Sequence, residues 1–200
     1  GLQVVYGNII ALGIGVQNSS GATQYIFGNI TSVSTGVILS SNNAIQNVFG
    51  NVVSSAGIAV TMSHDGVQNI TGNVSGAAVA YSVTGSDGKQ NIVGNIATGT
   101  SGAVSVTGST LTVRGNLAGS VIKTSGTVII FGNISASVNG YSVSQSSGTI
   151  NITGDISNGS SAYASIYITG GNSSIRGNVS GKVLNEGTGT VIVVGNVTSS

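Results

Sequence analysis

The sequence predicts an all-β protein, a single parallel β-solenoid (β-helix) of about ten turns with a repeat of about 21–22 residues, in which residues 1–200 form one domain. Three observations predict this fold. A Gly-Asn dipeptide recurs along the whole chain, aliphatic residues flank it with a period of two, and the chain has 33 glycines and no proline. Because proline lacks the N–H that a central strand donates, its absence is typical of a chain built almost wholly from paired strands.

The Gly-Asn repeat sets the length of each turn. The motif occurs ten times at intervals of 17 to 23 residues, and Asp155 once replaces its Asn. A unit of this length cannot bury its own apolar face, but stacked units can, with neighbouring strands about 4.8 Å apart. A meander, a sandwich or a barrel is the alternative, although none of these requires one motif at the same phase of every repeat. The two short steps, after Gly115 and Gly177, predict a narrower turn or a skipped strand.

The residues around each Gly form the first predicted strand of a turn. Aliphatic side chains stand two residues before and after it, as in Val48-Phe49-Gly50-Asn51-Val52. Alternate residues of a strand share a face, so the aliphatics and the Gly face inward, while the Asn faces outward or lies at a bend. A second apolar stretch, such as Tyr141-Ser142-Val143, follows 7 to 12 residues later, and turn formers separate the stretches. Each repeat therefore predicts two or three short strands.

Stacking turns each position of the repeat into a column of side chains. Asn after the Gly suits a repeated bend, because it tolerates left-handed backbone and hydrogen-bonds locally. The Gln four residues before the Gly faces inward, where amides bond along the stack, or it lies at a strand end and reaches water. The residue just before the Gly faces outward, which predicts a contact surface for another subunit or a glycan, or else a weakly constrained face. The predicted sets are an Asn column (Asn8, Asn29, Asn51, Asn73, Asn95, Asn116, Asn133, Asp155, Asn178, Asn196), a Gln ladder (Gln3, Gln24, Gln46, Gln68, Gln90) and an aromatic contact stack (Tyr6, Phe27, Phe49).

The early repeats resemble a known family. Gln46-Asn47-Val48-Phe49-Gly50-Asn51 and its two successors are similar to the Gln-x-x-x-Gly-Asn part of curli-type amyloid repeats, which have a similar length. The resemblance implies an extracellular, self-assembling biofilm fibre. Two features depart from that family: Val or Ile stands where curli repeats carry a Gly two residues after the Gln, and the Gln is absent from the last five repeats. The passenger domains of large bacterial adhesins are similar in composition, and they too imply a secreted β-solenoid.

The sequon Asn-x-Ser/Thr predicts surface sites for N-glycosylation. Those on the Gly-Asn column mostly skip a rung, as bulky glycans about 4.8 Å apart would require. Coincidence in a chain rich in Ser, Thr and Asn is the alternative. The candidate sites are Asn18, Asn29, Asn73, Asn133, Asn158, Asn172, Asn178 and Asn196.

Composition argues against several classes of partner. Charged residues are 4% of the chain, against about 25% in an average domain, and the net charge is +1, so we expect no nucleic-acid partner. We expect no membrane span, because no run of 18 apolar residues occurs. The absence of cysteine excludes disulfides and thiolate metal sites, and the chain starts at Gly1 without a signal-peptide pattern, which we interpret as a mature or trimmed chain.

The titratable residues do not suggest a catalytic site. The four acids, Asp65, Asp87, Asp155 and Glu186, lie in different repeats and form no pair for glycoside hydrolysis. His64 beside Asp65 is the sole His next to an acid, and a turn is the better interpretation than a Ser–His–Asp set. One His argues against zinc. We therefore expect no enzyme and no cofactor.

The function predicted from the sequence is structural. The chain starts and stops in phase with the motif, and an uncapped solenoid shows unpaired strand edges that invite pairing. We therefore expect a secreted, cell-surface filament subunit that assembles head to tail with itself. A spacer or stalk within a large surface adhesin is the first alternative, and a polysaccharide-binding or polysaccharide-degrading β-helix is the second.

Overall fold

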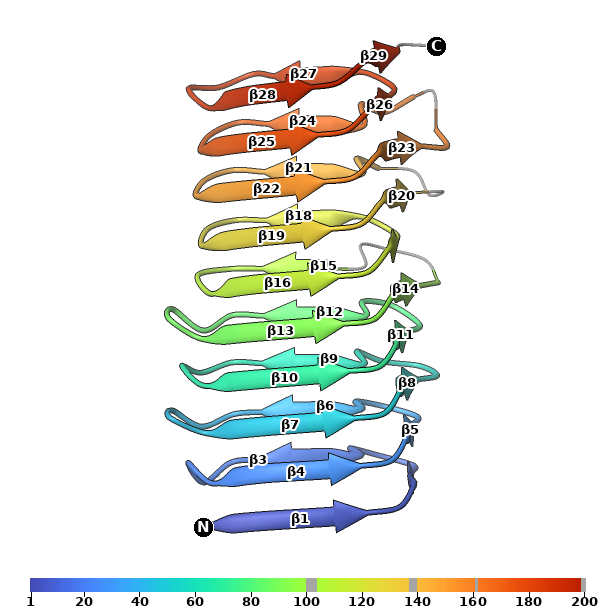
Figure 1. Cartoon of the computed structure of the whole chain (residues 1–200), viewed down its shortest axis with the longest axis vertical. Helices are drawn as coiled ribbons and strands as arrows, with labels where there is room; N and C mark the ends of the chain where they lie inside the picture. The colour runs from blue at the N-terminus through green and yellow to red at the C-terminus, as the bar shows by residue number, and fades with distance from the viewer. Residues whose placement is uncertain (100–103, 137–139, 161, 199–200) are drawn as a thin grey trace.

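Strands from successive coils form three parallel sheets, which confirms the predicted β-solenoid (Figure 1). The computed structural model describes residues 1–99, 104–136, 140–160 and 162–198, in which all regular elements are strands. Sheets A and B have ten strands and sheet C has nine over these residues. The described chain therefore makes nine three-stranded coils and two strands of a tenth.

Sheet A carries the longest strands, each of five residues, and ends just before the Gly of each motif. Its strands are β1 (Leu2–Tyr6), β4 (Thr23–Phe27), β7 (Ile45–Phe49), β10 (Val67–Thr71), β13 (Lys89–Val93), β16 (Thr110–Arg114), β19 (Thr127–Phe131), β22 (Thr149–Thr153), β25 (Asn172–Arg176) and β28 (Thr190–Val194).

Sheet B begins directly after the Asn of each motif. Its strands are β2 (Ile9–Ala11), β5 (Ile30–Ser32), β8 (Val52–Ser54), β11 (Val74–Gly76), β14 (Ile96–Thr98), β17 (Leu117–Ala118), β20 (Ile134–Ala136), β23 (Ile156–Asn158), β26 (Val179–Ser180) and β29 (Val197–Thr198).

Sheet C closes the coil from the second apolar stretch of each repeat. Its strands are β3 (Val16–Asn18), β6 (Val37–Leu39), β9 (Val60–Met62), β12 (Tyr81–Val83), β15 (Val104–Val106), β18 (Val121–Lys123), β21 (Val143–Gln145), β24 (Ile166–Ile168) and β27 (Val183–Asn185).

Equivalent residues of neighbouring coils pair directly, so the predicted columns are real features of the backbone. Gln68 pairs with Gln90 and Ile70 with Ile92, and the same register continues along sheet A. Within each A strand of the middle coils the second and fourth residues are buried and the fifth is exposed. Burial on one face of every strand fixes the register, because a slip of one residue would expose the whole apolar set.

The Gly of each motif forms the corner between sheets A and B, so the residues around it are two strands and not one. Gly72 has a φ of 151°, and a Cβ there would lie 2.2 Å from the carbonyl oxygen of Gly50 in the preceding coil. Side-chain-bearing residues rarely adopt this φ, and the stacked corners leave no room for a Cβ. Glycine at this position is therefore required by both conformation and space.

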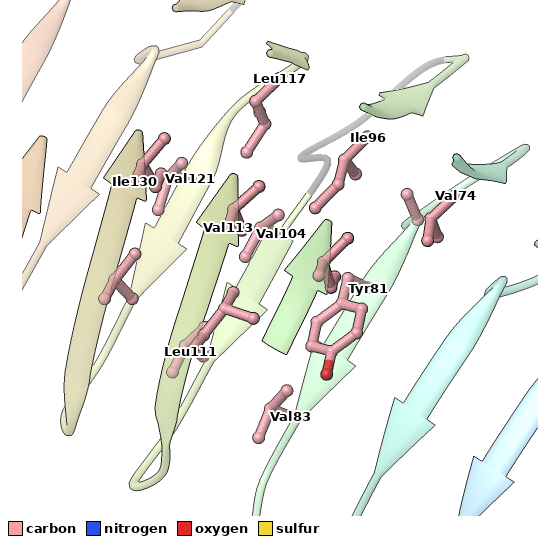
Figure 2. Packing of buried hydrophobic residues seen from close by; sticks show 14 of the residues in the cluster. Val74, Tyr81, Val83, Ile96, Val104, Leu111, Val113, Leu117, Val121 and Ile130 are labelled. Atoms are coloured by element: carbon pink, nitrogen blue, oxygen red, sulfur yellow. The ribbon is translucent and has the colours of Figure 1, made fainter. Parts of the chain in front are cut away.

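Three walls of aliphatic side chains enclose one continuous core (Figure 2). Leu111 and Val113 point inward from sheet A, Leu117 from sheet B and Val121 from sheet C. Tyr81 adds the largest fully buried side chain. The core runs along the axis, so each coil is stabilised mainly by the coils above and below it.

The two short repeats keep all three strands. After Gly115, sheet B contributes the two-residue β17, and two residues then connect it to β18. After Gly177, β26 is equally short and two residues connect it to β27. The chain therefore shortens the corner between sheets B and C, which is the narrower turn that the spacing allowed, and no strand is skipped.

Candidate functional site

The Asn column forms a continuous hydrogen-bonded ladder at the corner between sheets A and B. Asn73 donates its backbone N–H to Asn51 Oδ1 at 2.8 Å, and equivalent bonds of 2.7–3.1 Å join every neighbouring pair in the column. The flanking Gly and aliphatic N–H groups bond instead to backbone carbonyls, for example Gly72 to Val93. The side chain thus satisfies the one corner N–H that the sheets leave over.

Asp155 shows which atom of this column matters. Its N–H donates to Asn133 Oδ1, and its carboxylate oxygen Oδ1 accepts the N–H of Asn178 at 2.7 Å. A carboxylate supplies the same acceptor as the Asn amide but no donor. The ladder therefore needs the oxygen and leaves the Asn Nδ2 unused.

Four of the five predicted Gln residues form a second ladder inside the solenoid. Gln24 Nε2 donates to Gln3 Oε1 at 2.7 Å, Gln46 to Gln24 at 2.9 Å and Gln68 to Gln46 at 2.8 Å. Gln24, Gln46 and Gln68 are buried, and Gln3 at the end of the sheet is exposed. Each buried amide is paired, which avoids a penalty of about 1–3 kcal/mol.

Gln90 does not continue the ladder, so the prediction that it is the fifth member is wrong. Its Nε2 lies 2.9 Å from Met62 Sδ, and its buried Oε1 has no partner among the described residues. The Tyr81 hydroxyl takes the place that Gln90 would fill, donating to Gln68 Oε1 at 3.3 Å. Burial raises the pKa of Tyr81, so the hydroxyl stays protonated and able to donate.

The predicted aromatic contact stack exists as a stack of rings on the outer face of sheet A. The ring centroids of Tyr6 and Phe27, and of Phe27 and Phe49, lie 5.0 Å apart, with interplanar angles of 11° and 6°. Their exposed fractions are 79%, 37% and 43% respectively. The rings cover one another's faces, so their edges meet solvent.

A third amide ladder lies on the same outer face. Asn69 Nδ2 donates to Asn47 Oδ1 at 2.8 Å, and Asn91 Nδ2 donates to Asn69 Oδ1 at 2.9 Å. Sequence reasoning missed it, although the repeated Gln-Asn pair of these three strands carries the signal.

Two of the candidate glycosylation sites have side-chain nitrogens that are already hydrogen-bonded. Asn18 is buried, and its Nδ2 donates to the carbonyls of Ala22 and Ile45. Asn158 Nδ2 likewise donates to the carbonyls of Gly140 and Ala164. Asn18 is buried too deeply to carry a glycan, so this candidate is wrong. At Asn158 a glycan would replace one hydrogen of an amide that donates to two carbonyls, which argues against this candidate. The other candidates are exposed: Asn29, Asn73, Asn133, Asn172, Asn178 and Asn196.

Lys123 is an unexpected member of the core. Its inward position in β18 leaves it 1% exposed, and its Nζ donates to the carbonyl of Ser147. Burial lowers the pKa of Lys123 from 10.5 to about 8. Gln145 occupies the same column in the next coil. Its Oε1 accepts from Ser173 Oγ and its Nε2 donates to the carbonyl of Gly148, so the core around Lys123 is polar.

His64 and Asp65 do not form a catalytic pair with each other. His64 Nδ1 lies 3.0 Å from Ser63 Oγ, while the Asp65 carboxylate accepts from the Asp87 N–H and the Ser86 hydroxyl. The Asp87 N–H is the main cause that lowers the pKa of Asp65. No cluster of three metal-binding side chains occurs in the described ranges, and none of their elements is a helix that could span a membrane.

Comparison with known proteins gives no relative. The chain matches no family model, no curated protein and no solved structure. The internal geometry of the coils is therefore the basis for assigning a function.

Proposed function

We propose that this chain is a structural subunit of an extracellular filament, a biofilm or surface fibre, whose copies stack head to tail. The observation that carries the proposal is the Asn ladder. At this corner each coil offers a side-chain oxygen to a backbone N–H of the next coil, so the same bond joins every pair of neighbouring coils. In a stack, the Asn8 N–H of one copy would donate to Asn196 Oδ1 of the preceding copy.

Both ends of the solenoid present inward-facing aliphatic side chains that are only partly buried. Val5 at one end and Val191 and Val193 at the other point inward but are only half-buried, whereas the equivalent Ile70 of a middle coil is 1% exposed. Pairing β28 with β1 and β29 with β2 would bury these aliphatic residues at the junction. Such a heterologous contact does not close on itself and produces an open fibre.

The extracellular location rests on the resemblance of the early repeats to curli-type repeats. The physical properties of the chain agree with such a role. The core needs no disulfide or metal, because stacking continues it from coil to coil.

Electron microscopy of the purified chain tests the filament. Ten rungs about 4.8 Å apart predict an axial repeat of roughly 48 Å. Val193→Lys places a charge at the buried junction and should abolish fibres. Ile192→Lys, one residue earlier on the exposed face of the same strand, should leave them intact. Fibres that persist in Val193→Lys would refute stacking, and isolated rods from the unaltered chain would favour an adhesin stalk.

A further inference from the structure

The outward column in front of the Gly residues contains a gap. Phe131, Thr153 and Arg176 occupy this column in the successive strands β19, β22 and β25. Two rungs therefore separate Phe131 from Arg176, roughly 9.6 Å along the axis. Thr153 is too short to fill this space. In the Tyr6–Phe27–Phe49 stack, by contrast, every rung holds a ring and the centroids are 5.0 Å apart.

The gap is a slot with two different walls. Phe131, Thr153 and Arg176 line one surface pocket together with Asn151 and Ser174 from the neighbouring outward column. The guanidinium of Arg114 lies over the Phe131 ring, 4.9 Å from its centroid. Because Arg114 belongs to the preceding coil, it covers the ring face away from the slot. The open face of Phe131 is therefore the one turned toward Thr153 and Arg176.

The charge of this face favours an anion. The outward positions of the sheet A strands carry Lys89, Arg114 and Arg176 and no acid. The acid closest in sequence to the slot is Asp155, which lies beyond the corner with its carboxylate bonded to the Asn178 N–H. Asp155 offsets part of this charge, and Lys89 lies far from the slot beside Asp65 and Asp87. The attraction for an anion therefore comes from the guanidinium groups of Arg114 and Arg176 at the slot itself.

We infer that the slot binds one acidic sugar residue, a uronate, of an anionic polysaccharide. A flat group that contacts both walls requires roughly 7–8 Å between them, and a pyranose ring is somewhat thicker. The separation of roughly 9.6 Å between Phe131 and Arg176 accommodates such a ring. The apolar C–H face of the sugar would pack on Phe131, and the guanidinium fork of Arg176 would pair with the carboxylate. The Thr153 and Ser174 hydroxyls and the Asn151 amide would meet the sugar hydroxyls.

This site lies within one chain, so it does not depend on head-to-tail stacking. Isothermal titration calorimetry of the unassembled chain with hexagalacturonate, against neutral cellohexaose, measures it directly. We expect binding of the uronate and not of the neutral sugar, and weaker binding at high salt, because surface charges are screened. Absence of uronate binding by the unaltered chain would overturn the inference, whether or not fibres form.

Two variants and one control locate the binding. Thr153→Phe fills the slot and extends the ring stack from Phe131, so it should abolish binding. Thr71→Phe makes the same change beside Phe49, elsewhere in the column, and should bind like the unaltered chain. Arg176→Gln should weaken binding about tenfold or more, because it removes a charge-assisted pair.

The same variants distinguish the sugar from other anionic partners. Uronate binding that survives Thr153→Phe would refute the slot. Binding to phosphatidylglycerol vesicles without binding to hexagalacturonate would show that the basic face serves a membrane surface instead, and would overturn the assignment. Circular dichroism of each variant should keep the β-sheet spectrum, since the column already accepts Phe at other rungs.

Discussion

Replacing the buried lysine should make the protein more stable. In Lys123→Met the side chain keeps its length and loses its charge, and Met62 already occupies the equivalent inward position of another coil. The pKa of Lys123 falls from 10.5 to about 8 on folding because burial disfavours the charged form, which corresponds to a penalty of about 3 kcal/mol. Loss of the charged hydrogen bond to the Ser147 carbonyl offsets about 1.5 kcal/mol of this. We expect a net gain of about 1–2 kcal/mol in the free energy of unfolding at pH 7.

The direction of the pH dependence follows from proton binding. Between pH 8 and pH 10.5 the unfolded chain holds a proton on Lys123 that the folded chain has released. Unfolding then takes up a proton, so the free energy of unfolding rises with pH across this window. Below pH 8 both states are protonated and the full penalty remains. In Lys123→Met this rise should disappear.

Guanidinium denaturation followed by circular dichroism at pH 7, 8, 9 and 10 provides the measurement. Lys182→Met is the matched control, because Lys182 is exposed and its loss should leave the denaturation midpoint nearly unchanged. A Lys123→Met midpoint at or below that of the unaltered chain at pH 7 would refute the argument from burial. So would an unchanged rise between pH 8 and pH 10.

Five further substitutions test the corners and ladders by the same denaturation assay. Gly72→Ala should cost more than about 3 kcal/mol, because the new Cβ would lie 2.2 Å from the Gly50 oxygen; a midpoint equal to that of the unaltered chain would contradict the corner geometry. Asn73→Ala should cost about 1 kcal/mol by removing the acceptor, while Asn73→Asp should be tolerated, and equal losses in both would show that the oxygen is not the required atom. Gln46→Leu should cost about 1–3 kcal/mol by breaking the buried ladder, whereas Gln90→Leu should be neutral or stabilising because it removes an unpaired oxygen; the reverse order would refute the ladder.

The fold was predictable because one local pattern decides it. Alternation around each Gly predicts the buried faces of strands such as β7 and β8, and the constant phase of the motif predicts parallel stacking. Sheet C was less clear, since its strands lie outside the Gly-Asn motif and the corners that lead to them vary in length. The sequence therefore left open whether each repeat forms two strands or three.

The side-chain contacts that were missed depend on neighbours distant in sequence. Gln90 shares the motif of Gln68, but Tyr81 from sheet C reaches the oxygen that Gln90 would need. Lys123 looks like any scattered cation until the register places it in an inward column. The column in which a residue lies can be predicted from the repeat. Whether a side chain of sheet A or one of sheet C bonds to a given buried atom is decided by the three-dimensional structure.

The slot beside Thr153 was invisible for a different reason. It arises from a small residue between Phe131 and Arg176, two rungs apart, and no local motif marks such a vacancy in a column. Motifs in a sequence mark residues that are present, whereas the proposed slot is the space left by the short side chain of Thr153.

The equivalence of the corners also bears on how such a chain can change during evolution. Removing residues 73–94 would join Gly72 to Asn95, restore the motif and bring the Asn95 N–H to the Asn51 oxygen that Asn73 had used. Duplication of the same segment would close equally well. Unequal recombination between repeats could therefore lengthen or shorten the rod in steps of about 4.8 Å. Insertion of one residue inside a strand would instead turn the buried residues that follow it outward. Length is thus the property of this molecule most open to inherited variation.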